Sequence, residues 1–208
     1  MSNRKLLIYV VDDDVSVCKA LAILLNSHGF TVETFTRAED FLAFKHPKIS
    51  SCLVLDIRLP GINGLTLQNT MAARQLNIPI VFITGHGDVP KSVRAIKAGA
   101  IDFLLKPFTK KKLLNAISFA IAKSKIQNKK EVKIASIKRR IKTLSPRELE
   151  VFGFVAQGML SKQIASKRGT SLQTIKVHRG RVMHKMQAKT VTELIHLAQK
   201  AGITSPQA

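Results

Sequence analysis

Short apolar runs alternate with longer amphipathic stretches over the first 124 residues of the chain. Each run is rich in β-branched or aromatic residues and is bounded by turn-forming or polar positions, which is typical of buried strands. The predicted strands cover Leu6–Val11, Thr31–Phe35, Cys52–Leu55, Ile80–Ile83 and Phe103–Leu105. Because a helical pattern follows each run, the alternation predicts an α/β domain of parallel strands with crossover helices.

The amphipathic stretches predict the helices of this domain, at Val15–His28, Ala38–Lys45, Leu65–Gln75, Val89–Ala98 and from Lys110 onward. Gly99 is the expected stop of the fourth helix, because glycine adopts the left-handed conformation that ends many helices.

The helix from Lys110 meets no proline between Pro107 and Pro146, so it is expected to continue as a connector. An apolar stripe with 3, 4, 3 spacing runs along its second half, at Ile134, Ile137, Ile141 and Leu144. Such a stripe either packs on its own domain or forms a dimer contact through the connector, and both interpretations stay open.

The last 65 residues predict four short helices, with side-chain caps at Ser145, Ser161, Ser171 and Thr190. Ser145 with Glu148 and Thr190 with Glu193 have the spacing of a capping box, and Pro146 suits a first helical position. Short helices with glycine in the turns fit a helix-turn-helix.

The formal charge of +21 is unevenly distributed. Residues 1–124 contain 16 Lys and Arg against 9 Asp and Glu, whereas residues 125–208 contain 18 against 4, which gives +7 and +14. This excess indicates a polyanionic partner for the C-terminal segment. Ribosomal, membrane-surface or solubilising roles stay open on charge alone.

A cytoplasmic location is the default expectation, because Met1–Lys5 is polar and leads into a strand without a secretory signal. No apolar run approaches the roughly 20 residues of a membrane span, so a membrane is not an expected partner. Cys18 and Cys52 lack metal-ligand spacing and are expected to be small core residues.

Polar residues close four of the predicted strands: Asp12 with Asp13, Asp56, Thr84 and Lys106. In open α/β sheets, ligands bind beyond the carboxyl ends of the strands, so these side chains are expected to meet. A lone carboxylate can attack phosphorus, and phosphoryl transfer calls for a divalent metal and a cation nearby. Aspartates Asp12, Asp13 and Asp56 offer the hard oxygen ligands that Mg²⁺ prefers. Lys106 and the Thr84 hydroxyl would then contact the phosphoryl group.

The first 124 residues resemble the receiver domain of bacterial two-component response regulators. The similarity rests on Val-Val-Asp-Asp at 10–13, Leu-Asp-Ile-Arg-Leu-Pro-Gly at 55–61, Ile-Thr-Gly at 83–85 and Lys-Ala-Gly-Ala-Ile-Asp-Phe-Leu-Leu-Lys-Pro-Phe at 97–108. The resemblance implies a flavodoxin-like, doubly wound sheet in the order 2-1-3-4-5.

By the same resemblance, Asp56 accepts a phosphoryl group from a histidine of a sensor kinase, and the Arg58 carbonyl helps to hold Mg²⁺. Phe103 occupies the position of a switch aromatic, although a static core phenylalanine is the alternative. The Lys106–Pro107 bond matches a position that is commonly cis. Arg58 and His86 are expected to flank the phosphoryl group and to affect how long it persists.

Two other functions are alternatives to a phosphorylation switch. Asp56 could pass the phosphoryl group onward as a relay, although no second nucleophile accompanies it. Phosphatases of the haloacid-dehalogenase type need a second aspartate two residues on, where this chain has Arg58. The chain is therefore expected to be a phosphoacceptor that supports its own phosphorylation and dephosphorylation rather than an enzyme.

A helical wheel of residues 171–186 separates an apolar face from a basic one. The apolar face carries Ile175, Val182 and Met186, with His178 and Arg179 at its borders. The opposite face carries Gln173, Lys176, Val177, Gly180, Arg181 and His184. An exposed valine among cations suits a major groove, where it can touch thymine methyl groups.

Lys176 and Val177 are therefore expected to contact bases, and Arg179, Arg181 and Lys162 to contact phosphates of double-stranded DNA. Simple solvation of these charges is the alternative.

Residues 144–201 resemble the LuxR-type helix-turn-helix of NarL/FixJ-class regulators. The matching segments are Leu-Ser-Pro-Arg-Glu-Leu-Glu-Val at 144–151, Ala-Gln-Gly-Met-Leu-Ser-Lys-Gln-Ile-Ala at 156–165 and Thr-Ile-Lys-Val-His-Arg-Gly-Arg-Val-Met-His-Lys-Met at 174–186. The resemblance implies that the final helix contributes to dimerisation, through Leu194, Ile195 and Ala198.

These observations predict three segments: a receiver at 1–124, a helical linker at 125–143 and an all-α, four-helix DNA-binding domain at 144–208. The expected function is that of a response regulator which binds DNA as a phosphorylation-promoted homodimer to regulate transcription. RNA polymerase is a further candidate partner. DNA binding that does not depend on phosphate is the remaining alternative.

Overall fold

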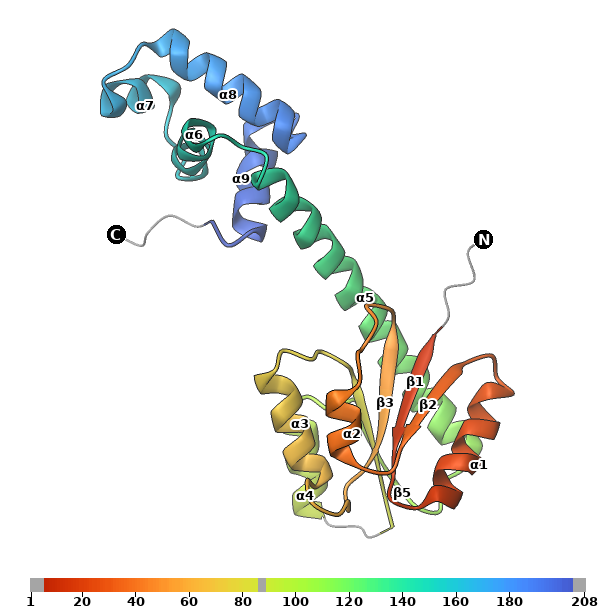
Figure 1. Cartoon of the computed structure of the whole chain (residues 1–208). Coiled ribbons are helices and arrows are strands. Elements are labelled where there is room, and N and C mark those ends of the chain that lie inside the picture. The colour runs from red at the N-terminus through yellow and green to blue at the C-terminus, as the bar shows by residue number, and fades with distance from the viewer. Residues whose placement is uncertain (1–5, 86–88, 204–208) are drawn as a thin grey trace. The chain divides into compact units, whose positions relative to one another are not determined.

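The computed structural model describes residues 6–85 and 89–203 of the 208-residue chain. The chain divides into two compact units, residues 1–128 and residues 129–208, and each is described by itself. Figure 1 shows the mixed sheet-and-helix first unit and the helical second unit. None of the helices in the described residues is long and apolar enough to cross a membrane.

The first unit contains a five-stranded parallel sheet in the order β2-β1-β3-β4-β5, as expected. The strands are β1 (Leu7–Val11), β2 (Thr31–Phe35), β3 (Ser51–Asp56), β4 (Ile80–Thr84) and β5 (Asp102–Leu105). Each end lies within one residue of its predicted position. Strand register aligns Val11 with Leu55 and Thr84 with Leu105, so the polar residues that close the strands lie along one edge.

Alternate residues of each strand face two separate hydrophobic cores. Along β1, Ile8 and Val10 face a core completed by α1 (Val15–Asn26) and α5 (Lys110–Ile141). Leu7, Tyr9 and Val11 face the other core, completed by α2 (Ala38–Ala43), α3 (Gly64–Ala73) and α4 (Val89–Lys97). Helices on both faces explain why the strands appear in the sequence as continuous apolar runs rather than as alternating ones.

Helix ends in the first unit follow local chemistry. The Asp14 side chain caps α1 by accepting from the backbone N–H of Ser16 at 2.7 Å. Gly99 follows α4 with a φ of 96°, the left-handed conformation expected of it. α5 continues to Ile141, beyond the boundary between the two units.

The second unit is formed by the last turns of α5 with α6 (Pro146–Ala156), α7 (Ser161–Arg168), α8 (Leu172–Met186) and α9 (Val191–Lys200). The predicted capping box at Ser145 and Glu148 is present, with bonds of 3.3 and 2.8 Å. Ser171 caps α8 as expected. Thr190 caps α9, but the Glu193 carboxylate accepts from the Lys189 N–H instead of completing the box.

The apolar stripe of the connector packs within the second unit. Ile137 is 2% exposed and belongs to its core, and Ile141 and Leu144 pack against that core. Arg140 donates to the Met186 carbonyl oxygen at 3.0 Å and ties α5 to the end of α8. Packing on its own domain therefore accounts for the stripe at these three positions.

Candidate functional site

Two buried carboxylates and one lysine meet at the carboxyl edge of the sheet. Asp12 follows β1 and Asp56 closes β3, and they are 1% and 5% exposed. Lys106, directly after β5, donates from its Nζ to Asp12 Oδ2 at 2.6 Å and to Asp56 Oδ1 at 3.0 Å. The sequence prediction that these strand-end residues meet is thus confirmed for the three of them.

The second oxygen of each carboxylate is held by the backbone. The Arg58 N–H donates to Asp56 Oδ2 at 2.6 Å, and the Asp14 N–H donates to Asp12 Oδ1 at 3.0 Å. Each aspartate thus accepts from the amide two residues further on, which is a turn that aspartate favours. The carboxylates are fixed in place before any ligand arrives.

Burial decides the protonation behaviour of this site. Burial raises the pKa of Asp56, and the bonds from Lys106 and from the Arg58 N–H only partly offset that rise. Burial acts to lower the pKa of Lys106, but hydrogen bonds to Asp12 and Asp56 outweigh it and raise that pKa. Lys106 therefore stays positively charged, whereas burial makes the ionised form of Asp56 unfavourable.

The other predicted residues of this site differ in how far they are buried. Asp13 is exposed, whereas Thr84 is 2% exposed at the end of β4, and its carbonyl oxygen accepts from the Lys106 N–H at 2.7 Å. Phe103 is half-buried and packs against the core beneath α2, α3 and α4. The Lys106–Pro107 bond is cis, as expected. The predicted His86 lies outside the described residues.

The oxygen donors suit Mg²⁺ in kind. Asp12 and Asp56 present carboxylate oxygens, the donors that this hard cation prefers. Within the described residues, however, no three His, Cys, Asp or Glu side chains form a ready metal-binding group. The Lys106 ammonium instead bridges the two buried carboxylates, so a divalent ion would have to share them with it.

The second unit presents a helix-turn-helix formed by α7, a three-residue turn at 169–171 and α8. Gly169 has a φ of 58°, a conformation that glycine adopts without strain and that turns the chain between the two helices. The predicted apolar face of α8 is buried, at Ile175, Val182 and Met186. The predicted basic face is exposed, at Gln173, Lys176, Val177, Gly180, Arg181 and His184.

Arg179 lies at the border of the α8 faces and has an internal partner. Its Nη1 donates to Ser161 Oγ at 3.1 Å, and the residue is half-buried. The bond joins α8 to the first residue of α7. Arg179 therefore helps to hold the two helices together through one of its N–H groups, whereas Lys162 and Arg181 are exposed.

Comparison with protein families assigns both halves of the chain. Residues 8–118 match the response regulator receiver domain, and residues 142–198 match the bacterial regulatory proteins of the luxR family. The transcriptional regulatory protein FixJ of Bradyrhizobium diazoefficiens is 42% identical over 94% of this chain and 96% of its own length. The chain belongs to the NarL/FixJ class of two-component response regulators.

Further relatives cover nearly the whole response regulator. Nodulation protein W of B. diazoefficiens is 42% identical over 98% of this chain and 90% of its own. The solved structure of the response regulator StyR is 42% identical and covers 94% of this chain and 99% of its own, with a TM-score of 0.80. Full-length FixJ from B. japonicum is 41% identical over 96% and 98% of the two chains, with a TM-score of 0.55.

The structure corrects two of the three dimer residues predicted for this response regulator. Leu194 and Ala198 are fully buried in the core of the second unit, where α9 packs on α6, and Ile195 is half-buried. Leu194 and Ala198 form the inner face of α9. They cannot reach a partner unless that core opens, so any dimer contact through α9 must use its outer face.

Two residues of the receiver site were missed by sequence reasoning. A Cβ on Gly64 would lie 2.4 Å from the carbonyl oxygen of Asp56, so only glycine fits where α3 begins. The Cys18 thiol donates to the Asp12 carbonyl oxygen at 3.3 Å. Neither contact has a signal in the sequence, because each depends on how a helix approaches the strand end.

Proposed function

We propose that this response regulator accepts a phosphoryl group on Asp56 from a sensor histidine kinase, and that the phosphorylated form binds double-stranded DNA as a homodimer to regulate transcription. The observation that carries the proposal is the buried Asp56 carboxylate held 3.0 Å from the Lys106 ammonium. A buried acid next to a fixed cation is arranged to take up a group with more negative charge.

In the proposed reaction a carboxylate oxygen of Asp56 attacks the phosphorus of a phosphohistidine. The phosphorus–nitrogen bond breaks, its electron pair returns to the kinase imidazole, and Asp56 becomes an acyl phosphate. Lys106 would pair with the phosphoryl oxygens, and the Thr84 hydroxyl would donate to them. Hydrolysis of the acyl phosphate would restore Asp56, so the receiver is a phosphoacceptor rather than a turnover enzyme.

Mg²⁺ is the proposed cofactor, held by Asp12, Asp13, Asp56 and the Arg58 carbonyl. When bound, it would neutralise charge that develops on the transferring oxygens. The Arg58 N–H donates to Asp56 Oδ2 at 2.6 Å, which supports a role for the Arg58 backbone beside the acceptor.

The signal is proposed to leave the site through Thr84 and Phe103. Thr84 lies at the end of β4, and Phe103 pairs with Phe82 across the sheet and is only half-buried. Because the Phe103 side chain is only partly packed, it can turn inward when the Thr84 hydroxyl moves toward the phosphoryl group. Phosphorylation would then shift a pre-existing equilibrium toward the active form.

The output surface is the exposed face of α8. Lys176 and Val177 are proposed to contact bases, and Arg181 with Lys162 to contact phosphates. The excess positive charge of the C-terminal segment supports a nucleic-acid partner. Cytoplasmic location and a contact with RNA polymerase are part of the same proposal.

The acceptor step is tested with a small phosphodonor and Mg²⁺, followed by mass spectrometry of the proteolysed protein. One phosphoryl group is expected on the peptide that contains Asp56, with loss of the label in Asp56→Asn and on chelation of the metal. Label on another residue, or equal labelling of Asp56→Asn, would contradict the proposal. Equal DNA affinity before and after complete labelling would instead support phosphate-independent binding.

A further inference from the structure

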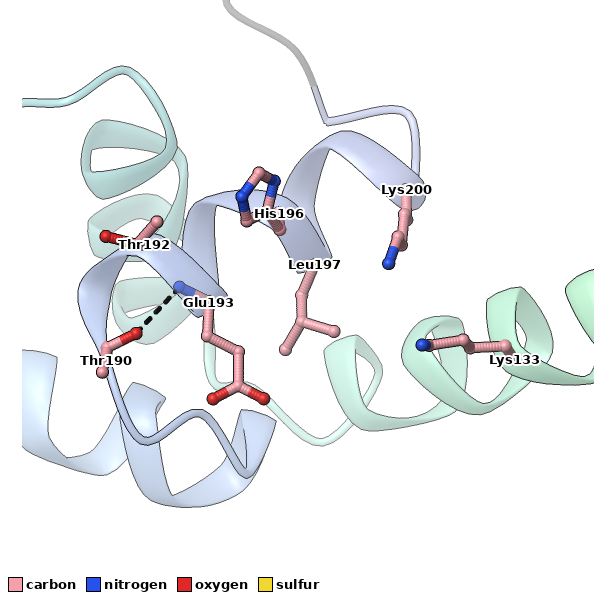
Figure 2. A pocket seen from close by; sticks show the side chains of 7 residues that line it. All are labelled: Lys133, Thr190, Thr192, Glu193, His196, Leu197 and Lys200. Atoms are coloured by element: carbon pink, nitrogen blue, oxygen red, sulfur yellow. Dashed lines mark hydrogen bonds between the residues drawn. The ribbon is translucent and has the colours of Figure 1, made fainter.

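A hollow of about 500 Å³ lies in the second unit between α5 and α9. Figure 2 shows its lining, with Leu197 at its centre and the side chains of Lys133 and Lys200 turned toward it. Leu197 is 9% exposed and belongs to the core, so its outer surface forms an apolar floor. The α5–α9 hollow thus combines two cations from different helices with an apolar base.

Three of the four carboxylates of this unit have other hydrogen-bond partners than Lys133 and Lys200. Glu148 accepts from Lys185 at 2.6 Å and Glu150 from Arg168 at 2.8 Å. Glu193, although it lines the hollow, accepts from the Lys189 N–H at 2.9 Å.

The remaining acid, Glu131, precedes Lys133 by two residues on α5, and helical residues at this spacing do not face each other. Across residues 129–203, all of which the structure describes, neither Lys133 nor Lys200 forms an ion pair. Among the described residues of this unit, the two lysines of the α5–α9 hollow therefore form no ion pair, and they outnumber the one carboxylate of its lining, that of Glu193.

The charge of the unit indicates what would fill the hollow. Residues 129–208 contain 17 Lys and Arg against 4 Asp and Glu, so a second copy would bring the same excess of positive charge. The lining comes from α5, α9 and the turn before α9, whereas the proposed base contacts lie on α8. A concave apolar floor also suits a side chain better than a phosphodiester backbone.

We propose that the α5–α9 hollow docks an acidic segment of a partner protein. Carboxylates of the segment would pair with Lys133 and Lys200, and an apolar side chain between them would rest on Leu197. The methylene stems of the two lysines would extend the apolar surface while their ammonium groups meet the carboxylates. The inference is independent of Asp56 and of phosphorylation.

The test uses the full chain and a fluorescent peptide with one leucine between pairs of glutamates, read by anisotropy. The variant Lys133→Glu/Lys200→Glu is compared with Lys138→Glu/Lys142→Glu, whose exposed lysines lie on or just after α5 and do not line the hollow. Both variants change the net charge equally. Peptide affinity is expected to fall about tenfold or more in the first and less than about twofold in the second.

Four results would overturn the proposal. Equal losses in the two variants would show general attraction to a basic protein, and equal binding of a glutamine version of the peptide would show that carboxylates are not recognised. If Lys133→Glu/Lys200→Glu loses affinity for a DNA duplex as well as for the peptide, the hollow binds nucleic acid instead. A change in the self-association of that variant in sedimentation would assign it to a second copy.

Discussion

Replacing the phosphoacceptor should stabilise the protein. Asp56→Asn removes a carboxylate that is 5% exposed and whose pKa is raised mainly by burial. A carboxyl whose pKa is higher in the folded state contributes stability that is complete below its unfolded pKa and is lost as pH rises through the folded pKa. The wild type loses this contribution as pH rises through the folded pKa of Asp56, whereas asparagine does not titrate.

The size of the gain follows from opposing contributions. Burying a carboxylate costs several kcal/mol, and charge-assisted hydrogen bonds from Lys106 and from the Arg58 N–H return about 1.5–3 kcal/mol each. Asparagine keeps an oxygen for the Arg58 N–H, and Lys106 keeps Asp12 at 2.6 Å. We therefore expect Asp56→Asn to be about 1–2 kcal/mol more stable at pH 7.

The chain has one tyrosine and no tryptophan, and Tyr9 is fully buried in β1, so tyrosine emission during urea unfolding reports on the first unit alone. The gain should shrink as pH is lowered toward about 4, near the unfolded pKa of aspartate. The exposed control Asp13→Asn should change stability by less than about 0.5 kcal/mol. A destabilised Asp56→Asn, or an equal gain at both pH values, would show that burial of the Asp56 charge does not limit stability.

Three further substitutions test other parts of the structure. Gly64→Ala would push against the Asp56 carbonyl, so stability should fall by about 1–3 kcal/mol in the tyrosine assay and phosphorylation should slow; a wild-type rate would argue against this close contact. Lys176→Ala should weaken binding to preferred DNA sites by about 1–3 kcal/mol. Arg181→Ala should weaken binding to all sequences alike and reduce the slope of log affinity against log salt concentration by about 0.9. Identical behaviour of the two variants would contradict the assignment of Lys176 to bases and Arg181 to phosphates. The hydrogen bond from Lys185 lowers the pKa of Glu148. This carboxylate therefore stabilises the fold above its unfolded pKa, and the stabilisation is lost as pH falls through the folded pKa. By circular dichroism, Glu148→Gln should be less stable than the wild type by about 1–3 kcal/mol at pH 7 and should match it near pH 3.

The sheet and the two faces of α8 were predictable because each has a strong periodic signal. Strands buried on both faces must be continuously apolar, as in Cys52–Leu55, and polar residues that follow them mark the carboxyl edge of the sheet. The α8 wheel predicted burial correctly because a helix packed on one side has a wide apolar stripe.

Contacts between elements distant in the sequence were not predictable in the same way. The apolar face of α9 shows that Leu194 and Ala198 pack against something, but the sequence does not say whether this is α6 or a second copy. The same limit applies to Gly64, since its close approach to Asp56 depends on how α3 meets β3.

The N-terminal cap of α7 also differs from the one that the sequence predicts. Ser161 was expected to precede α7, yet it is the first helical residue, and the Gln163 side chain accepts from the Leu160 N–H at 2.8 Å instead. An amide three residues inside the helix can satisfy the same free N–H as a serine before it.

Control of DNA binding by phosphorylation of Asp56 can be measured by titrating double-stranded DNA with wild type and Asp56→Asn. Each protein is measured at one salt concentration with Mg²⁺, before and after treatment with a small phosphodonor. The wild type should gain at least about fivefold in affinity, as expected of a coupling of 1 kcal/mol or more, and Asp56→Asn should gain nothing. Equal affinities for treated and untreated wild type, with Asp56 shown to be phosphorylated, would contradict the account.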